Sequence, residues 1–169
     1  MRQLIIALIL LGSVLALGPA QSATAAPAVT YYVMPTVSVT PTLCSGVECD
    51  TFGIRYDYSG EGSCTSCYPT DLLRAGLFSL TFTPNRFFPN DPIRARSGIG
   101  TLSVVWADST TTTAAYSFKA RDSKAYSLTG KVTGGTNSRF TAGTAVDGLV
   151  GLPPNPVEPG TTAAAISFG

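Results

Sequence analysis

The sequence predicts an all-β fold: a small antiparallel β-sandwich or barrel of about eight short strands, stapled by disulfides. Short segments alternate apolar and polar residues with the period of a half-buried strand, and turn-forming residues separate them. No long segment has the periodicity of an amphipathic helix. Four cysteines lie close together downstream of an apolar leader, as in many disulfide-bonded exported proteins.

Three strands are predicted in the first half of the chain from apolar residues at alternate positions, over residues 28–39, 51–58 and 77–83. Pro35 should interrupt the first of them with a bulge or a bend. The glycine-containing residues 59–62 predict a turn after the second strand. Residues 71–76 are expected to begin as a helical turn before the third strand.

A long connection and a meander follow. Residues 83–100 contain three prolines and few strand formers, which predicts an irregular loop. Three further strands are predicted over residues 99–107, 112–120 and 124–133. Because short turns join them, successive strands should pair antiparallel. Trp106 lies in the most apolar of these segments, and we expect it in the core.

Two last strands are predicted over residues 144–152 and 163–168, with an extended, stiff proline-rich link between them. Gly130, Gly143 and Gly148 are expected to lie in strongly bent strands, where a side chain must be absent for two backbones to approach. This expectation favours closure into a barrel.

The N-terminus has the pattern of a secretory signal. Arg2 precedes an apolar run too short to span a bilayer, and Ala23 and Ala25 match the small residues of a cleavage site. We therefore expect residues 1–25 to be removed and residues 26–169 to form a single β domain that is secreted or periplasmic. No membrane span is expected in the mature chain, and a transmembrane barrel is disfavoured because the strands are short and no aromatic girdle appears.

Composition excludes several functions. Eleven Lys and Arg face ten Asp and Glu, and loss of Arg2 with the leader balances them, so no net charge attracts nucleic acid. The absence of histidine excludes Ser-His-Asp and Cys-His catalysis and His-ligated metals. We assign no catalytic, cofactor-binding or metal-binding residue, and we expect no cofactor.

Cysteines with spacings of x4, x14 and x2 stand at Cys44, Cys49, Cys64 and Cys67. In an exported chain they predict two disulfides. We prefer the nested pairing, Cys44 with Cys67 and Cys49 with Cys64, because a turn at 59–62 would bring the flanks together; consecutive pairing is the close alternative. A zinc site and a redox-active C-x2-C pair are disfavoured, because export favours disulfides and no βαβ pattern surrounds the pair.

The long loop carries the candidate binding residues, which are Arg86, Phe87, Phe88, Arg94 and Arg96. Arginine and aromatic side chains are enriched at binding hot spots. The simpler interpretation, which we favour, is that Phe87 and Phe88 close one end of the core.

A cluster of carboxylates is the remaining candidate for chemistry: Glu48, Asp50, Asp57 and Glu61. Two carboxylates in one cleft suffice for a glycosidase, but solvated surface acids explain the cluster more simply. We therefore expect a cofactor-free binding or extracellular structural module rather than an enzyme, with an unidentified protein, glycan or small molecule as its partner. The alternatives are a carboxylate-dependent secreted hydrolase and a self-assembling surface subunit.

Overall fold

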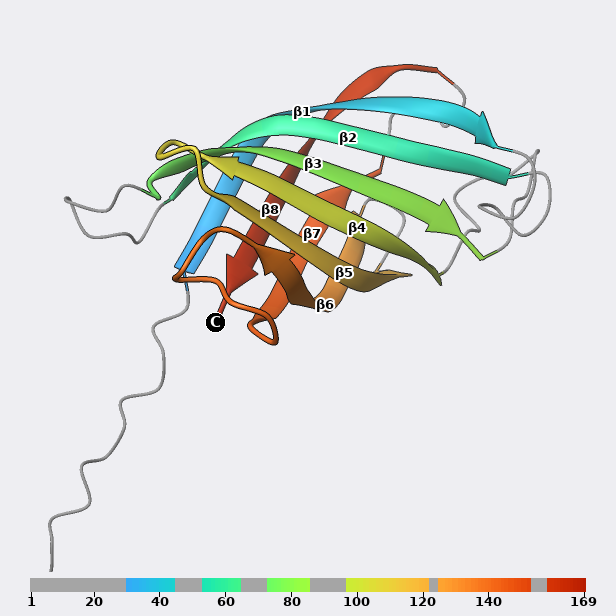
Figure 1. Ribbon diagram of the computed structural model, residues 1–169. Coiled ribbons are helices and arrows are strands. Elements are labelled where there is room, and N and C mark those ends of the chain that lie inside the picture. The colour runs from blue at the N-terminus through green and yellow to red at the C-terminus, as the bar shows by residue number, and fades with distance from the viewer. Residues whose placement is uncertain (1–29, 45–52, 65–72, 86–96, 122–124, 153–157) are drawn as a thin grey trace, which may run out of the picture.

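Eight strands form a closed antiparallel barrel in which each strand pairs with its neighbours in chain order and the first pairs with the last (Figure 1). The computed structural model describes residues 30–44, 53–64, 73–85, 97–121, 125–152 and 158–169. The strands are β1 (Thr30–Cys44), β2 (Gly53–Cys64), β3 (Ala75–Pro84), β4 (Ser97–Trp106), β5 (Thr111–Ala120), β6 (Ala125–Gly135), β7 (Ala145–Gly151) and β8 (Gly160–Phe168). The all-β prediction is confirmed, and the architecture is the barrel rather than the sandwich.

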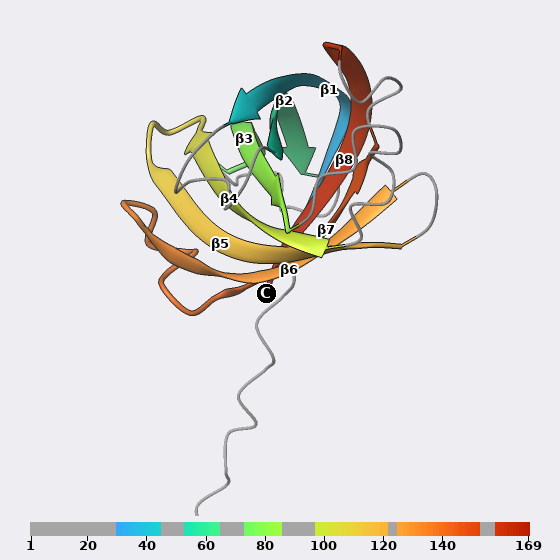
Figure 2. The same cartoon turned by 90° about the vertical axis from the view of Figure 1, so that its right-hand side faces the viewer.

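The closure is made by β1, which pairs with β2 on one side and with β8 on the other, so β8 lies beside β1 in the end-on view (Figure 2). Both pairings shift register before Val37. Pro35 lies in this irregular stretch, and it has no N–H to donate to either neighbour. The predicted bulge is therefore confirmed.

The predicted turn at residues 59–62 is wrong, because β2 continues through it to Cys64. Gly60 pairs with Phe78 and Gly62 pairs with Gly76 of β3. A Cβ atom on Gly62 would overlap the Phe78 ring. Glycine occurs here because an aromatic ring lies over the strand, and the chain does not turn.

The meander of β4, β5 and β6 is confirmed. The eight strands are seven to 15 residues long, and all but β7 are longer than the segments predicted for them. A Cβ on Gly130 would lie 2.6 Å from Tyr116 Cβ, and one on Gly148 would lie 2.6 Å from Ile166 Cδ1, so both glycines permit the predicted close approach. Gly143 is not in a strand; it adopts φ +94° between β6 and β7. No helix in the described ranges is long and apolar enough to cross a membrane.

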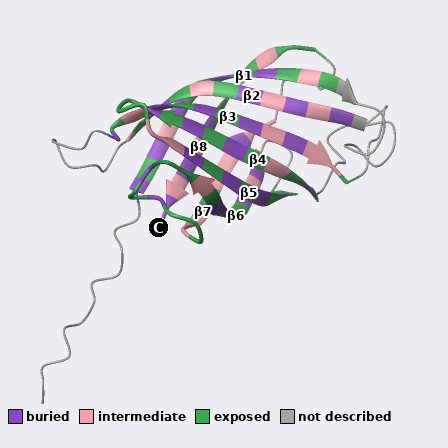
Figure 3. Ribbon diagram, viewed as in Figure 1, coloured by how far each residue is buried: buried purple, intermediate pink, exposed green. Residues whose placement is uncertain are grey.

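Buried and exposed residues alternate along the strands, so that one face of each strand fills the barrel (Figure 3). Eight strands enclose a space just wide enough for side chains. One aromatic group lies toward the chain termini and comprises Tyr32, Phe78, Trp106, Phe140 and Phe168. A second group lies toward the other end and comprises Tyr56, Tyr58, Phe82, Tyr116, Phe118 and Tyr126. Trp106 is in the core, as predicted.

The connection between β6 and β7 closes the end of the barrel near the termini. Phe140 stacks on Phe168 with ring centroids 4.5 Å apart. Buried Asn137 holds this connection in place, because its Oδ1 accepts hydrogen bonds from the backbone N–H groups of Arg139 and Phe140. Phe140 is therefore an end plug that the sequence did not indicate, whereas Phe87 and Phe88, the expected plug, lie outside the described residues.

Candidate functional site

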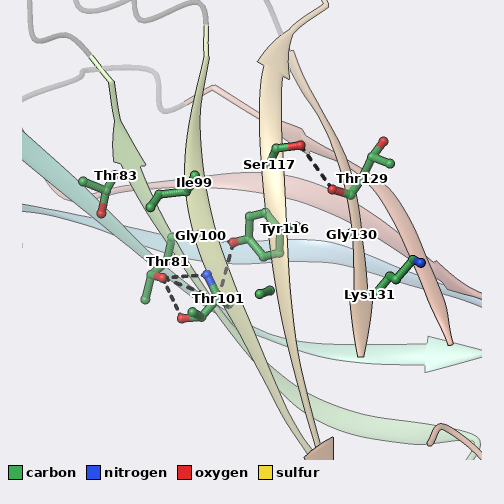
Figure 4. Close-up of a pocket in the computed structure, with 11 residues that line it drawn as sticks. Thr81, Thr83, Ile99, Gly100, Thr101, Tyr116, Ser117, Thr129, Gly130 and Lys131 are labelled. Atoms are coloured by element: carbon green, nitrogen blue, oxygen red, sulfur yellow. Dashed lines mark hydrogen bonds between the residues drawn. The ribbon is translucent and has the colours of Figure 1, made fainter. Parts of the chain in front are cut away.

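An open trough with a volume of about 580 Å³ runs over the outer wall of the barrel across β3 to β6 (Figure 4). Strand pairing places two rungs of outward residues in it: Ile99, Ser117 and Thr129 form one rung, and Thr101, Ala115 and Lys131 form the other. The residues on β5 are the small ones, Ala115 and Ser117. The floor of the trough is therefore β5, and the larger side chains of β4 and β6 make its two walls.

Tyr116 occupies the inward position between the two floor residues. Its ring lies against Gly100 of β4 and its Cβ lies against Gly130 of β6, where added Cβ atoms would be only 2.5 and 2.6 Å away. The absence of side chains at both glycines lets β4 and β6 approach Tyr116 closely. Its neighbouring residues on β5 then present only a methyl and a hydroxymethyl group to the outside.

The Tyr116 hydroxyl also makes a hydrogen bond where the backbone pairing between β3 and β4 is interrupted. The pairing of β3 with β4 passes from Leu80–Leu102 to Thr83–Ile99, and the residues between these pairs are not matched. There the Thr101 N–H donates to Thr81 Oγ1 at 3.0 Å, and the Tyr116 hydroxyl donates to the Thr81 carbonyl at 2.6 Å. Side-chain hydrogen bonds thus replace part of the backbone ladder under the trough.

The lining of the trough is mostly neutral. Threonine and serine hydroxyls border it, Ile99 is 64 % exposed, and Lys131 alone among the lining residues carries a charge. The hydroxyls are held by neighbours: Ser117 Oγ donates to the Thr129 carbonyl at 3.3 Å. Each hydroxyl can donate and accept, so the walls suit a partner that has both functions.

The predicted binding loop begins and ends at this trough. Its predicted bounds, 83–100, were too wide, because Thr83 and Pro84 belong to β3 and Ser97 to Gly100 belong to β4. The Asn85 N–H donates to the Ser97 carbonyl at 3.0 Å and joins the two ends of the loop. The candidate residues Arg86, Phe87, Phe88, Arg94 and Arg96 lie outside the described residues.

The described carboxylates of the predicted cluster are not in the trough. Asp57 lies on the outer face of β2, where it is 3.1 Å from Arg55 in an ion pair and accepts a hydrogen bond from Thr42. Glu61 is exposed on the same face. Glu48 and Asp50 lie outside the described ranges. Among described side chains, no group of three or more potential metal ligands occurs.

Strand register limits how the cysteines can pair. Cys44 ends β1, whereas Cys64 pairs with Tyr32 near the other end of the same strand, which places the two roughly 30 Å apart. Cys49 is within about 18 Å of Cys44, and Cys67 is within about 11 Å of Cys64, by chain length alone. A disulfide needs Cα atoms within about 7 Å. The nested pairing that we preferred is therefore incompatible with this register, and of the two pairings considered only the consecutive one fits it.

Sequence reasoning missed the trough because its residues come from four separate strands. The available signal was the tyrosine at 116 with glycines at 100 and 130, but these become neighbours only once the register is known. Fold and site together describe an up-and-down eight-stranded β-barrel with a hollow in its outer wall. Comparison of the chain with protein-family models, curated proteins and solved structures found no match, so the function has to be inferred from the site.

Proposed function

We propose that the protein is an exported, cofactor-free binding module whose outer trough holds a glycan chain. The observation that carries this proposal is the trough itself: about 580 Å³, with a floor of small residues and walls of neutral hydroxyls. This volume lies within the range of about 300–1,000 Å³ typical of ligand sites.

Sugar chemistry matches the lining. Sugar hydroxyls donate and accept hydrogen bonds, as do Thr101, Ser117 and Thr129. The exposed Ile99 and the methyl group of Ala115 offer apolar contact to the C–H face of a sugar ring. Lys131 supplies a charged donor for a sugar oxygen or an acidic substituent.

The closed barrel argues against partners that add a strand. Every described strand pairs on both sides over most of its length, and among the described strands the longest one-sided edge is the end of β1, residues 40–44, which pairs with β2 alone. Tyr116 covers the one place where the β3–β4 ladder opens. Recognition through side chains is favoured, and a self-assembling subunit would have only short edges of this kind for strand pairing.

The hydrolase alternative has less support than binding. It required at least two carboxylates of the cluster in one cleft, but Asp57 and Glu61 point outward from β2 and neither lines the trough. Asp57 is also engaged with Arg55.

Export and two disulfides are part of the proposal. The signal pattern of residues 1–25 supports export to an oxidising compartment, where paired cysteines form disulfides. Chain reach supports Cys44 with Cys49 and Cys64 with Cys67, each of which would close a short loop at one end of the β1–β2 hairpin.

The test is binding of the mature protein to an array of neutral and acidic oligosaccharides, followed by calorimetric titration with the best ligand. Ala115→Arg would fill the floor of the trough and should weaken binding at least tenfold. Thr113→Arg is the matched control, because Thr113 is also exposed on β5 but does not line the trough, and it should bind as the wild type does.

Absence of binding to every glycan, or equal binding by the two arginine variants, would overturn the proposal. Release of reducing ends from the bound glycan during incubation would instead support the hydrolase.

A further inference from the structure

The outer wall that contains the trough carries positive charge and no negative charge. The outward residues of β3, β4, β5 and β6 include two lysines, Lys119 and Lys131, and no aspartate or glutamate. Both lysines are exposed, and neither forms an ion pair with a described residue. Acidic and basic residues are almost balanced over the whole chain, so the positive charge is a local property of this wall.

Strand register places the two lysines on either side of one rung of the trough. Lys131 lies on the neighbouring rung toward the chain termini, and Lys119 lies two residues beyond Ser117 on β5, in the other direction. Strand dimensions place their Cα atoms about 14 Å apart. A ligand chain laid along β5 would therefore pass one lysine, then the rung between them, then the other lysine. That rung consists of Ile99, Ser117 and Thr129 (Figure 4).

The neighbours of Lys131 direct a negative group toward the floor of the trough. The residues paired with it are Ala115 on β5 and Ala145 on β7, and neither has a polar side chain that could compete for the ammonium group. Asp147 lies diagonally from Lys131, opposite Thr129 on β7. Its negative charge disfavours an acidic group on the β7 side of the lysine, and the β5 side is left.

Carboxylates border this wall on its other sides without entering it. Asp57 and Glu61 lie on β2, opposite Thr81 and Leu77 of β3, and Asp57 is already in an ion pair. Asp108 lies in the turn after β4, at the end of the barrel near the termini. An acidic ligand is therefore favoured in the middle of the wall, along β5, where the two lysines are.

On the basis of the proposed glycan-binding function, we propose that the ligand of the trough is an acidic oligosaccharide in which acidic and neutral sugars alternate. Lys119 and Lys131 each pair with a carboxylate or sulfate group, and the neutral sugar between them lies on the exposed Ile99. An ammonium group gains more from a charged acceptor than from a neutral hydroxyl. An acidic group over Ile99 would contact an apolar side chain and lose hydration without gaining a counter-charge.

The same wall is unsuited to single-stranded nucleic acid, the other common linear polyanion. Proteins that bind single strands stack the bases on aromatic side chains. The outward residues of β3 to β6 include no aromatic side chain, and the Tyr116 ring faces inward.

The experiment titrates the full mature protein calorimetrically with three hexasaccharides at one ionic strength. The hyaluronan hexasaccharide has a carboxylate on every second sugar, the galacturonate hexasaccharide has one on every sugar, and the chitin hexasaccharide has none. Hyaluronan should bind about tenfold more tightly than chitin, and more tightly than galacturonate. A thymidylate oligonucleotide should bind about tenfold more weakly than hyaluronan.

Variants assign the preference to the two lysines. Lys119→Gln and Lys131→Gln should each reduce the preference for hyaluronan over chitin about fivefold to tenfold, whereas Lys131→Arg keeps the charge and should retain the preference. Arg74→Gln is the matched control: it removes an exposed cation just before β3, outside the trough, and should bind as the wild type does. Ala115→Gln fills the floor without adding charge and should weaken all three hexasaccharides.

Equal affinity for the hyaluronan and chitin hexasaccharides would overturn the acidic ligand and leave glycan binding in the trough intact. An unchanged preference in both glutamine variants would overturn the role of the lysines. Tighter binding of galacturonate or of the oligonucleotide would show that charge alone decides, which contradicts the alternating ligand. Absence of binding to all three hexasaccharides would overturn the proposed function itself.

Discussion

The Tyr116 hydroxyl of β5 donates a 2.6 Å hydrogen bond to the Thr81 carbonyl of β3, across the intervening strand β4. The ring can cross β4 because Gly100 lies beneath it; a Cβ there would be 2.5 Å from the ring. One side chain therefore ties three strands together where their backbone ladder is incomplete. It also supports the floor of the trough.

Tyr116→Phe should destabilise the barrel by about 1–3 kcal/mol, because the Thr81 carbonyl is left without its donor in a partly buried position. Denaturant titration should show a lower midpoint with an unchanged m-value. Tyr126→Phe is the comparison, since no described residue is hydrogen-bonded to that hydroxyl, and its midpoint should remain near that of the wild type. Equal midpoints for Tyr116→Phe and the wild type would contradict the role of the hydrogen bond.

Substitution by alanine should lower stability at one glycine of β6 and leave it almost unchanged at another. A Cβ on Gly130 would crowd Tyr116 and the β5 backbone, so Gly130→Ala should cost about 1–3 kcal/mol. A Cβ on Gly134 would have only Thr113 Oγ1 near it, at 3.6 Å, and Gly134→Ala should change stability by less than about 0.5 kcal/mol. Thermal unfolding of both variants is the measurement. A similar loss of stability in both would show that the close approach of Tyr116 to Gly130 is not the cause of the cost.

Phe140→Ala should cost about 3–5 kcal/mol, because it removes the ring stacked on Phe168 and leaves a cavity at the end of the core. Leu77→Ala provides the contrast: Leu77 is 62 % exposed on the outer wall, and its loss should change stability by less than about 0.5 kcal/mol. Chemical denaturation distinguishes the two. A small loss for Phe140→Ala would mean that the connection between β6 and β7 does not close the barrel.

Stability should fall above pH 10. Burial raises the pKa of Tyr32 and Tyr56 from 10.0 to about 12. The unfolded chain releases these protons first as the pH rises, so their contribution to stability is complete below pH 10 and is lost between pH 10 and about 12. Melting curves across this interval, read together with tyrosinate absorbance, test the prediction; a constant Tm to pH 12 would contradict it.

Peptide mapping of the unreduced mature protein should find Cys44 joined to Cys49 and Cys64 joined to Cys67. The strand register separates the two pairs by the length of the β1–β2 hairpin. A disulfide-linked peptide that joins Cys44 to Cys67, or Cys49 to Cys64, would show that the register between β1 and β2, or the closure of the barrel through β1, is incorrect.

Local pattern alone predicted which residues of a strand face inward. Trp106 is in the core as predicted, and Tyr116 and Phe118 share the inner face of β5, because alternation along a strand is a property of neighbouring residues. The bulge at Pro35 was also predictable, since proline lacks an N–H whatever surrounds it.

The sequence did not show whether a glycine lies in a turn or permits the close approach of a neighbour, and the fold distinguished the two roles. Residues 59–62 suggested a turn, yet Gly62 lies in β2 because the ring of Phe78 needs its space. Gly143 was expected in a strand and instead adopts a positive φ in a connection. The same residue type serves turns and close approaches, and only the neighbour across the sheet distinguishes them.

The trough was decided by tertiary structure alone. Ile99, Ala115 and Lys131 become neighbours only through the register of three strands. The sequence by itself determined that alternating strands would bury one face, since that depends on residues two positions apart. Pairing partners are set by closure of the whole barrel, in which a shift of one residue would turn every inward side chain outward.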